Sequence, residues 1–239
     1  MHQLWLIPVF PLAGFAINGL IGRKSGKNVV NAIAVGSVLL SFLWVLKALS
    51  AMGLWGAGMP EEAHVERYFT WIQSGNLNIG FDLAVDRLGA VMLLVVTGIG
   101  GLIHIYATGY MHDDNAFWRF FAYLNLFTAA MLILVLGDSL LLLFVGWEGV
   151  GLCSYALIGF WYQDHANARA GNKAFIVNRI GDFGFVLDVF AFLVARCPGP
   201  WHADFPRNGQ MGCDTAKPDD LGCSRDHPCY PFTFRRGDR

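Results

Sequence analysis

Six long runs of apolar residues are separated by short polar segments along this chain. The runs cover residues 3–22, 29–49, 87–108, 117–136, 139–160 and 171–195. Each is close to the length of about 20 residues that a helix needs to cross the hydrocarbon of a membrane. Stretches such as 91–103 carry no charge on any side, whereas a surface helix of a soluble protein keeps one charged face. The pattern predicts an all-α polytopic membrane protein with about six transmembrane helices, and it disfavours a soluble helical bundle.

The polar segment 50–86 contains a second pattern. Hydrophobic residues recur there at every other position, which is typical of a half-buried strand: Leu77, Ile79, Phe81, Leu83 and Val85. Residues 68–72 are suited to be the partner strand, because Ser74-Gly75-Asn76 between the two has the composition of a turn. We expect a small extracytoplasmic β-hairpin here, and the alternative is an irregular loop.

The end of the chain differs sharply from the rest. Residues 197–239 hold six of the nine prolines and four of the five cysteines, and no Ile or Val. Such a segment buries too little apolar surface to offset an ordering cost of about 1–2 kcal/mol per residue. We therefore divide the chain into a transmembrane helical domain, 1–196, and an irregular Pro/Cys-rich tail, 197–239. The spacing of Cys213, Cys223, His227 and Cys229 lacks the C-x₂-C pairs of zinc sites, so no metal is expected.

Composition and charge agree with this division. Hydrophobic residues make up 55% of the chain and charged residues 15%, against about 25% charged residues in a soluble domain. A net charge of −1 leaves no basic surface for nucleic acid. Residues 1–22 carry no Lys or Arg, unlike a cleavable signal peptide, and Arg23, Lys24 and Lys27 follow directly. By the positive-inside rule the N-terminus lies outside and the 23–28 loop in the cytoplasm.

Charged residues within the apolar runs are the candidates for chemistry, because a charge at the centre of a spanning helix costs roughly 2.5–3.5 kcal/mol. Glu148 lies near the middle of the 139–160 run and is flanked by glycines. Such a carboxylate can exchange a proton if a nearby cation moves, and the alternative is a permanent structural ion pair. Asp138, in the turn before this run, is expected to cap the helix.

The last run carries the largest set of charges, namely Lys173, Arg179, Asp182 and Asp188. Arg179 and Asp182 are three positions apart, so they share a helix face and could form a self-contained pair. Lys173 and Asp182 are nine apart and should face different neighbours, which favours charges shared among helices. His104, late in the 87–108 run, is a further candidate for proton relay, or else binds a backbone carbonyl.

Three segments resemble one protein family. The fifteen-residue block Gly146-Trp147-Glu148-Gly149-Val150-Gly151-Leu152-Cys153-Ser154-Tyr155-Ala156-Leu157-Ile158-Gly159-Phe160 is similar to the fifth-helix signature of the L-type, antiporter-like membrane subunit of respiratory complex I, NADH:quinone oxidoreductase. Residues 119–127 and 173–182 resemble the starts of its fourth and sixth helices. The resemblance covers the chain to about residue 195.

This resemblance implies a translocase subunit in which protons move through a buried network. The expected proton path contains Glu148, Lys173, Arg179 and Asp182, with His104 as a further member. No cofactor is expected in this chain, since NADH, FMN, iron–sulfur clusters and quinone act in other subunits and no redox chemistry occurs here. The expected partners are the other membrane subunits of complex I and the lipid bilayer, in a bacterial inner membrane crossed several times.

Two further hypotheses remain open. A cation/proton antiporter or membrane hydrogenase subunit also keeps a Trp-Glu pair, but generally with other flanks. In the family, a Lys on a broken seventh helix pairs with the fifth-helix Glu, and this chain changes character before that helix. The second hypothesis is therefore that the tail is a frameshift or truncation product and that the chain is an inactive fragment or assembly partner.

Cysteine labelling tests the predicted orientation. With the five native cysteines replaced by serine, Ser25→Cys should resist an impermeant thiol reagent in intact cells, whereas Gly75→Cys should react. The reason is that the cations beside Ser25 hold that loop in the cytoplasm. Labelling of Ser25→Cys from outside would reverse the topology.

Overall fold

The computed structural model describes residues 3–53, 63–74 and 77–196. Within these ranges six α-helices and one two-stranded antiparallel sheet follow one another in the order α1, α2, β1, β2, α3, α4, α5, α6. The helices are α1 (Leu6–Ile21), α2 (Lys27–Ala51), α3 (Arg87–Tyr110), α4 (Phe117–Leu136), α5 (Leu140–Ile158) and α6 (His165–Arg196), and the strands are β1 (His64–Ser74) and β2 (Leu77–Val85). The predicted helical class and the hairpin are confirmed. The tail, with its cysteines, lies outside the described residues.

Four of the described helices, α2 to α5, are long and apolar enough to cross a membrane. The α1 helix is apolar but has 16 residues, or about 24 Å at 1.5 Å per residue. The α6 helix has 32 residues and begins six positions before the predicted run. Its first turns are polar, so the apolar pattern alone did not include them. The chain is a multi-pass membrane protein, and the total of six spans stays a prediction.

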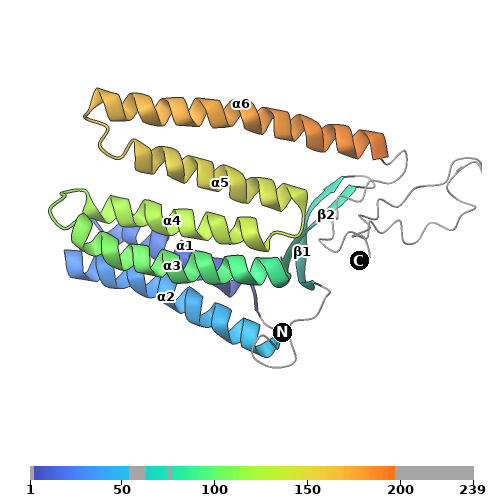
Figure 1. Ribbon diagram of the computed structural model, residues 1–239, viewed down its shortest axis with the longest axis horizontal. Coiled ribbons are helices and arrows are strands. Elements are labelled where there is room, and N and C mark those ends of the chain that lie inside the picture. The colour runs from blue at the N-terminus through green and yellow to red at the C-terminus, as the bar shows by residue number, and fades with distance from the viewer. Residues whose placement is uncertain (1–2, 54–62, 75–76, 197–239) are drawn as a thin grey trace, which may run out of the picture.

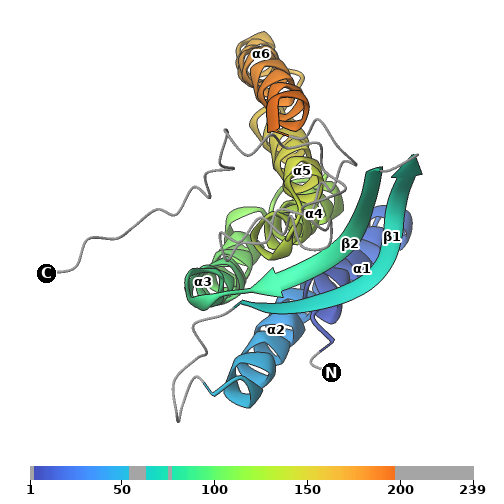
Figure 2. The same ribbon diagram turned by 90° about the vertical axis from the view of Figure 1, so that its right-hand side faces the viewer.

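The α4 helix is central to the bundle. It packs against α1, α2, α3 and α5, whereas α6 packs mainly against α5. Figure 1 shows the six helices running side by side, with α6 at the outer edge. In the end-on view α5 and α6 form an arm that extends away from the other four helices (Figure 2). One face of α5 and most of α6 therefore border whatever surrounds the protein.

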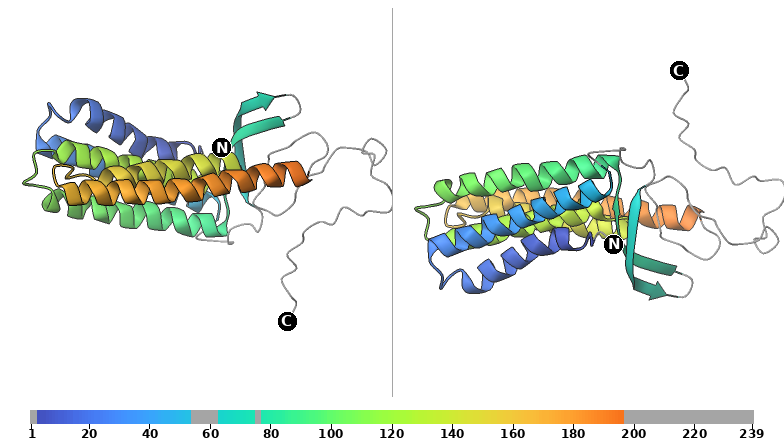
Figure 3. Two further views of the ribbon diagram at one scale, coloured as in Figure 1. Left: turned by 90° about the horizontal axis from the view of Figure 1, so that it is seen from above. Right: turned by 90° about the horizontal axis from the view of Figure 1, so that it is seen from below.

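The hairpin closes one end of the bundle. Leu83 and Val85 of β2 belong to one apolar cluster with residues of α1, α2, α3, α4 and α5. The short turn between α4 and α5 adds to the sheet, because Gly137 forms a bridge with Leu83 and Asp138 N donates to Asp82 O at 3.2 Å. Both views in Figure 3 place the hairpin at the end where the chain begins.

Two side chains of β1 cap the first helix. The Glu66 carboxylate accepts hydrogen bonds from Gln3 N at 3.1 Å and Leu4 N at 2.9 Å, and Tyr68 Oη accepts from Trp5 N. These donors directly precede α1 and would otherwise lack partners. Burial raises the pKa of Tyr68, and its hydrogen bond to Glu66 adds to the rise. The hairpin is thereby fixed to the start of α1.

The expected cap of α5 was wrong by one residue. Ser139, rather than Asp138, is the N-cap, and its hydroxyl accepts from Leu142 N at 3.2 Å. The backbone of Asp138 is held by β2, which places the next residue at the start of the helix.

The α5 helix approaches α4 closely through two glycines. A Cβ at Gly146 would lie 2.6 Å from Leu134 N and 2.7 Å from Leu134 Cα, and one at Gly149 would lie 2.9 Å from Ala130 Cβ. Gly151, on the same helix, has nothing within 4 Å of this position. Small residues of this kind let membrane helices pack backbone to backbone.

A pair of alanine substitutions measures this approach. Gly146→Ala should lower the stability of the protein in detergent by roughly 1–3 kcal/mol, because the backbone of α4 has to move. The matched Gly151→Ala should be neutral or stabilising, since Ala favours a helix over Gly by about 1 kcal/mol. Thermal unfolding followed by circular dichroism gives both values. Equal unfolding midpoints for the two variants would contradict this packing.

Candidate functional site

An ion pair joins the two outer helices. Arg179 Nη1 of α6 donates to Glu148 Oε2 of α5, and the two residues are 31 positions apart in sequence. The side chain of Glu148 is 22% exposed and that of Arg179 is 43% exposed. Glu148 is the ninth residue of a 19-residue helix that is otherwise free of charge. The pair thus lies midway along α5.

A second carboxylate lies beside this pair on α6. Trp147 Nε1 of α5 donates to Asp182 Oδ1 at 2.8 Å, and Asp182 is 8% exposed. Adjacent residues of α5 therefore hold the two charged residues of α6 that are one turn apart. The hypothesis of a self-contained Arg179–Asp182 pair is wrong, because each finds its partner across the helix interface.

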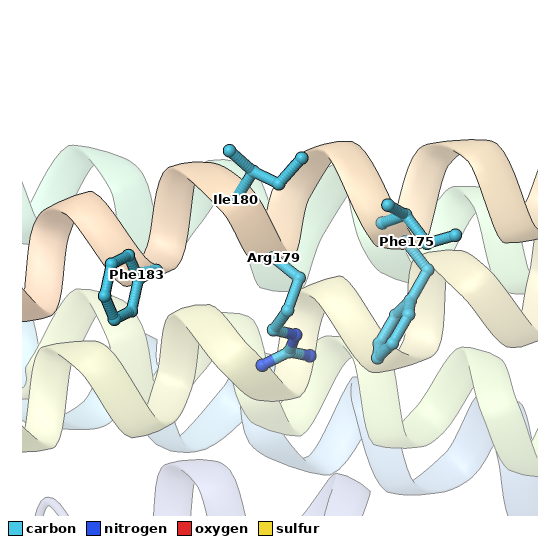
Figure 4. A pocket seen from close by; sticks show the side chains of 5 residues that line it. Phe175, Arg179, Ile180 and Phe183 are labelled. Carbon is cyan, nitrogen blue, oxygen red and sulfur yellow. The ribbon is translucent and has the colours of Figure 1, made fainter.

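The surroundings of Arg179 are apolar. Its Cζ atom lies 4.6 Å from the centroid of the Phe175 ring, a distance suited to a cation–π contact. A pocket of about 340 Å³ on this surface is lined by Phe175, Ile176, Arg179, Ile180 and Phe183. Figure 4 shows Arg179 and Phe175 extending toward α5, while Ile180 points away from it. The surroundings of the guanidinium are therefore polar only on the side that faces α5.

The structure separates Lys173 from this cluster. Lys173 is exposed and precedes Arg179 by six residues, which is about 9 Å along a helix. Asp188 is also exposed, farther along α6. Of the four residues expected in the proton path, the fold thus brings together Glu148, Arg179 and Asp182, and it leaves Lys173 apart.

His104 belongs to a different part of the bundle. Its ring lies between α3 and α4, with Nδ1 2.7 Å from Gly100 O and Nε2 3.0 Å from Asn125 Oδ1. The carbonyl partner expected from the sequence is confirmed, and the relay stays a prediction.

The sequence pattern does not indicate two of the polar partners. They are Trp147, which donates to Asp182, and Asn125, which lies beside His104. A polar residue in the middle of an otherwise apolar run, as Asn125 is in 117–136, was the available signal.

Two family models match the chain. Residues 71–121 match the N-terminus of chain 5 of NADH-ubiquinone oxidoreductase (complex I), and residues 137–197 match the transmembrane region of the NADH:quinone oxidoreductase/Mrp antiporter family. The second range contains Glu148, Arg179 and Asp182. Both matches are thus to membrane domains of complex I and Mrp antiporter subunits.

Individual relatives come from the same group of proteins. Subunit L of the NADH-quinone oxidoreductase of Escherichia coli K12 is 45% identical over 190 residues, which cover 80% of this chain and 30% of the relative. The subunit L of Mycobacterium tuberculosis H37Rv is 44% identical over 197 residues, with 79% and 29% covered. The chain spans less than a third of the length of these curated relatives.

Two solved assemblies contain a similar fold. A chain of the Mrp complex from Dietzia sp. DQ12-45-1b matches with a TM-score of 0.66 and 24% identity, over 83% of this chain and 20% of the other. A chain of an archaeal membrane-bound sulfane sulfur reductase matches with a TM-score of 0.61 and 19% identity, over 82% and 28%. These likenesses concern the fold alone.

A double-mutant cycle tests the pairing across α5 and α6. Glu148→Gln and Arg179→Gln should each destabilise the protein, because each leaves one charge without its partner in an apolar setting. The double variant should lose less than the sum of the two, with a coupling of roughly 0.5–3 kcal/mol. Unfolding of the four proteins in detergent supplies the cycle, and strictly additive losses would contradict the pairing. Asp188→Asn, with Arg179→Gln, provides an additive reference.

Proposed function

We propose that this chain is part of a proton-translocating subunit of NADH:quinone oxidoreductase and that Glu148 is its proton-exchanging carboxylate. The single observation that carries the proposal is the Glu148–Arg179 ion pair, which joins α5 to α6 midway along α5. Ionisable residues at membrane depth are costly, and they commonly mark proton or ion pathways.

The chemistry follows from the arrangement of charges. A guanidinium beside a carboxylate favours the ionised carboxylate, whereas an apolar environment without the cation favours the protonated acid. Movement of Arg179 away from Glu148 therefore causes proton uptake, and its return causes release. Arg179 is suited to such movement, since it is 43% exposed and ends a long flexible side chain.

Asp182 offers the moving cation a second anion. It lies one helical turn from Arg179, on the same α6 face, and is already oriented by Trp147. In this proposal Arg179 alternates between Glu148 and Asp182, so its positive charge is never left in the membrane without a counter-charge. Lys173, nearer the start of α6, serves as a further cation of the proton path, outside the Glu148 cluster.

The expected surroundings follow from the family. We place the chain in a bacterial inner membrane with its N-terminus outside, beside other membrane subunits of complex I. The hairpin lies at the end of the bundle where the chain begins, and the α1–α2 and α3–α4 connections meet at the opposite end, where Lys27 Nζ donates to His112 O. Arg23, Lys24 and Lys27 are thus grouped at one end, which supports the inferred orientation. The redox cofactors, NADH, FMN, iron–sulfur clusters and quinone, are assigned to other subunits.

A cation/proton antiporter is the second candidate. The fold similarity to a chain of an Mrp complex favours it, although the identity of 24% supports the fold alone. The subunit L relatives at 44–45% identity favour the complex I assignment. Sodium-dependent proton movement in vesicles would distinguish the antiporter.

Substitution of the carboxylate tests the proposed role. In a full-length relative, the change that corresponds to Glu148→Gln should preserve assembly but lower proton pumping at least tenfold, because an amide does not exchange a proton at neutral pH. Glu148→Asp should be milder, since the charge remains. Pumping is measured with a pH-sensitive dye in vesicles during NADH oxidation.

The matched control is Asp188→Asn, which removes one negative charge from an exposed site on α6. It should pump at the wild-type rate. Normal pumping by the Glu148→Gln variant would refute the assigned role.

A further inference from the structure

His104 is an isolated ionisable residue in the inner four helices. Within α1 to α4, the other charged residues lie near helix ends: Lys27, Lys47, Arg87 and Arg119. The tyrosines of these helices include Tyr106 and Tyr110, which are largely exposed, and Tyr123, which is half-buried. His104 is 1% exposed. The ring is therefore nearly inaccessible, and none of the other charged side chains of α1 to α4 is an anion.

Both ring nitrogens of His104 face oxygen atoms. Nδ1 is 2.7 Å from Gly100 O, and Nε2 is 3.0 Å from Asn125 Oδ1. A neutral imidazole carries one N–H and can donate to only one of these acceptors, whereas an imidazolium donates to both. Both oxygen atoms therefore accept a hydrogen bond from the ring only when it carries two N–H groups.

The amide of Asn125 supplies the complementary arrangement. Its Nδ2 atom is buried without a hydrogen-bond partner, although buried polar groups are nearly always paired. Rotation of the amide by about 180° exchanges Oδ1 and Nδ2, two atoms of nearly equal size. Nδ2 then donates to Nε2, and Nδ1–H of the neutral ring still donates to Gly100 O. One rotation therefore satisfies each protonation state of the ring.

The amide lies close to the backbone of α1 at Gly14. A Cβ placed at Gly14 of α1 would lie 2.7 Å from Asn125 Nδ2 and 2.4 Å from Ser37 Oγ of α2. Gly14 thus leaves room for these two polar groups to meet. The Ser37 hydroxyl, which now donates to Ala34 O at 2.9 Å, can serve whichever amide atom faces it.

We propose that His104 and Asn125 form a reversible proton-binding site, separate from the Glu148 cluster, in which the Asn125 amide turns over as the proton binds. One proton from the aqueous phase adds to the Nε2 lone pair, and the ring gains one positive charge. Asn125 Oδ1 and Gly100 O accept from the two N–H groups of the charged ring. Its use as a second proton carrier in transport rests on the proposed function, but the binding of the proton does not.

Nitrogen NMR of the protein in lipid nanodiscs tests the site directly. With ¹⁵N-labelled histidine and asparagine, one Nε2 resonance should move from the unprotonated to the protonated position between about pH 8 and pH 5. The Asn125 Nδ2 resonance should move with the same midpoint. His104→Gln should remove this titration, whereas His112→Gln, at an exposed loop position, should keep it.

Two substitutions at Asn125 separate the proposed site from a structural hydrogen bond. Asn125→Asp keeps the shape but only accepts from the ring, so His104 should stay protonated across the range. Asn125→Leu removes the acceptor, so the ring should stay neutral. A His104 ring that is neutral down to pH 5 in the unchanged protein, or a titration unaffected by both substitutions, would overturn the proposal.

The same measurement is independent of the Glu148 hypothesis. Glu148→Gln should leave the His104 titration in place. Loss of pumping in that variant with an intact titration supports both proposals, and normal pumping with an intact titration removes only the Glu148 role. The pH profile of pumping in a full-length relative should shift with Asn125→Asp if the second site takes part in transport, and an unchanged profile would contradict that part.

Discussion

The close approach of α5 to α4 determines where the charges of this protein lie. Gly146 and Gly149 press one face of α5 against the backbone of α4 at Leu134 and against Ala130. The residues between them, Trp147 and Glu148, both make their polar contacts on the α6 side. Because α6 packs mainly on α5, its position depends on this contact. Without Gly146 and Gly149, the Glu148–Arg179 site would lose the packing that fixes the position of α5.

Hydrocarbon offers no hydrogen bonds, so polar side chains in the bundle find their partners within the protein. They do so in an outer cluster and in an inner cluster. The outer one pairs Glu148 with Arg179 and Trp147 with Asp182, and its side chains keep some exposure. The inner one places His104 between a carbonyl and an amide and is nearly inaccessible. The proposals above assign a moving cation to the partly exposed cluster and a proton-binding ring to the buried one.

The hairpin supplies hydrogen-bond partners and apolar contacts at one end of the bundle. Glu66 supplies acceptors for backbone donors at the start of α1, and the apolar residues of β2 cover the ends of the neighbouring helices. The end of α4 and the start of α5 join β2 through Gly137 and Asp138. The α5 helix is therefore held at its first turn as well as at its glycines, which limits how far Glu148 can shift along the bundle.

The sequence by itself determined the helices, the hairpin and the charged candidates, because these depend on local periodicity and on the cost of charge in hydrocarbon. Apolar runs located α4 within one residue, and the alternation from Leu77 to Val85 located β2. Only the tertiary structure decided the partners. Spacing along one helix suggested that Arg179 pairs with Asp182, but the packing of α5 on α6 gives them Glu148 and Trp147 instead. Likewise Asn125 contacts His104 because α3 packs against α4, a contact that no local pattern encodes.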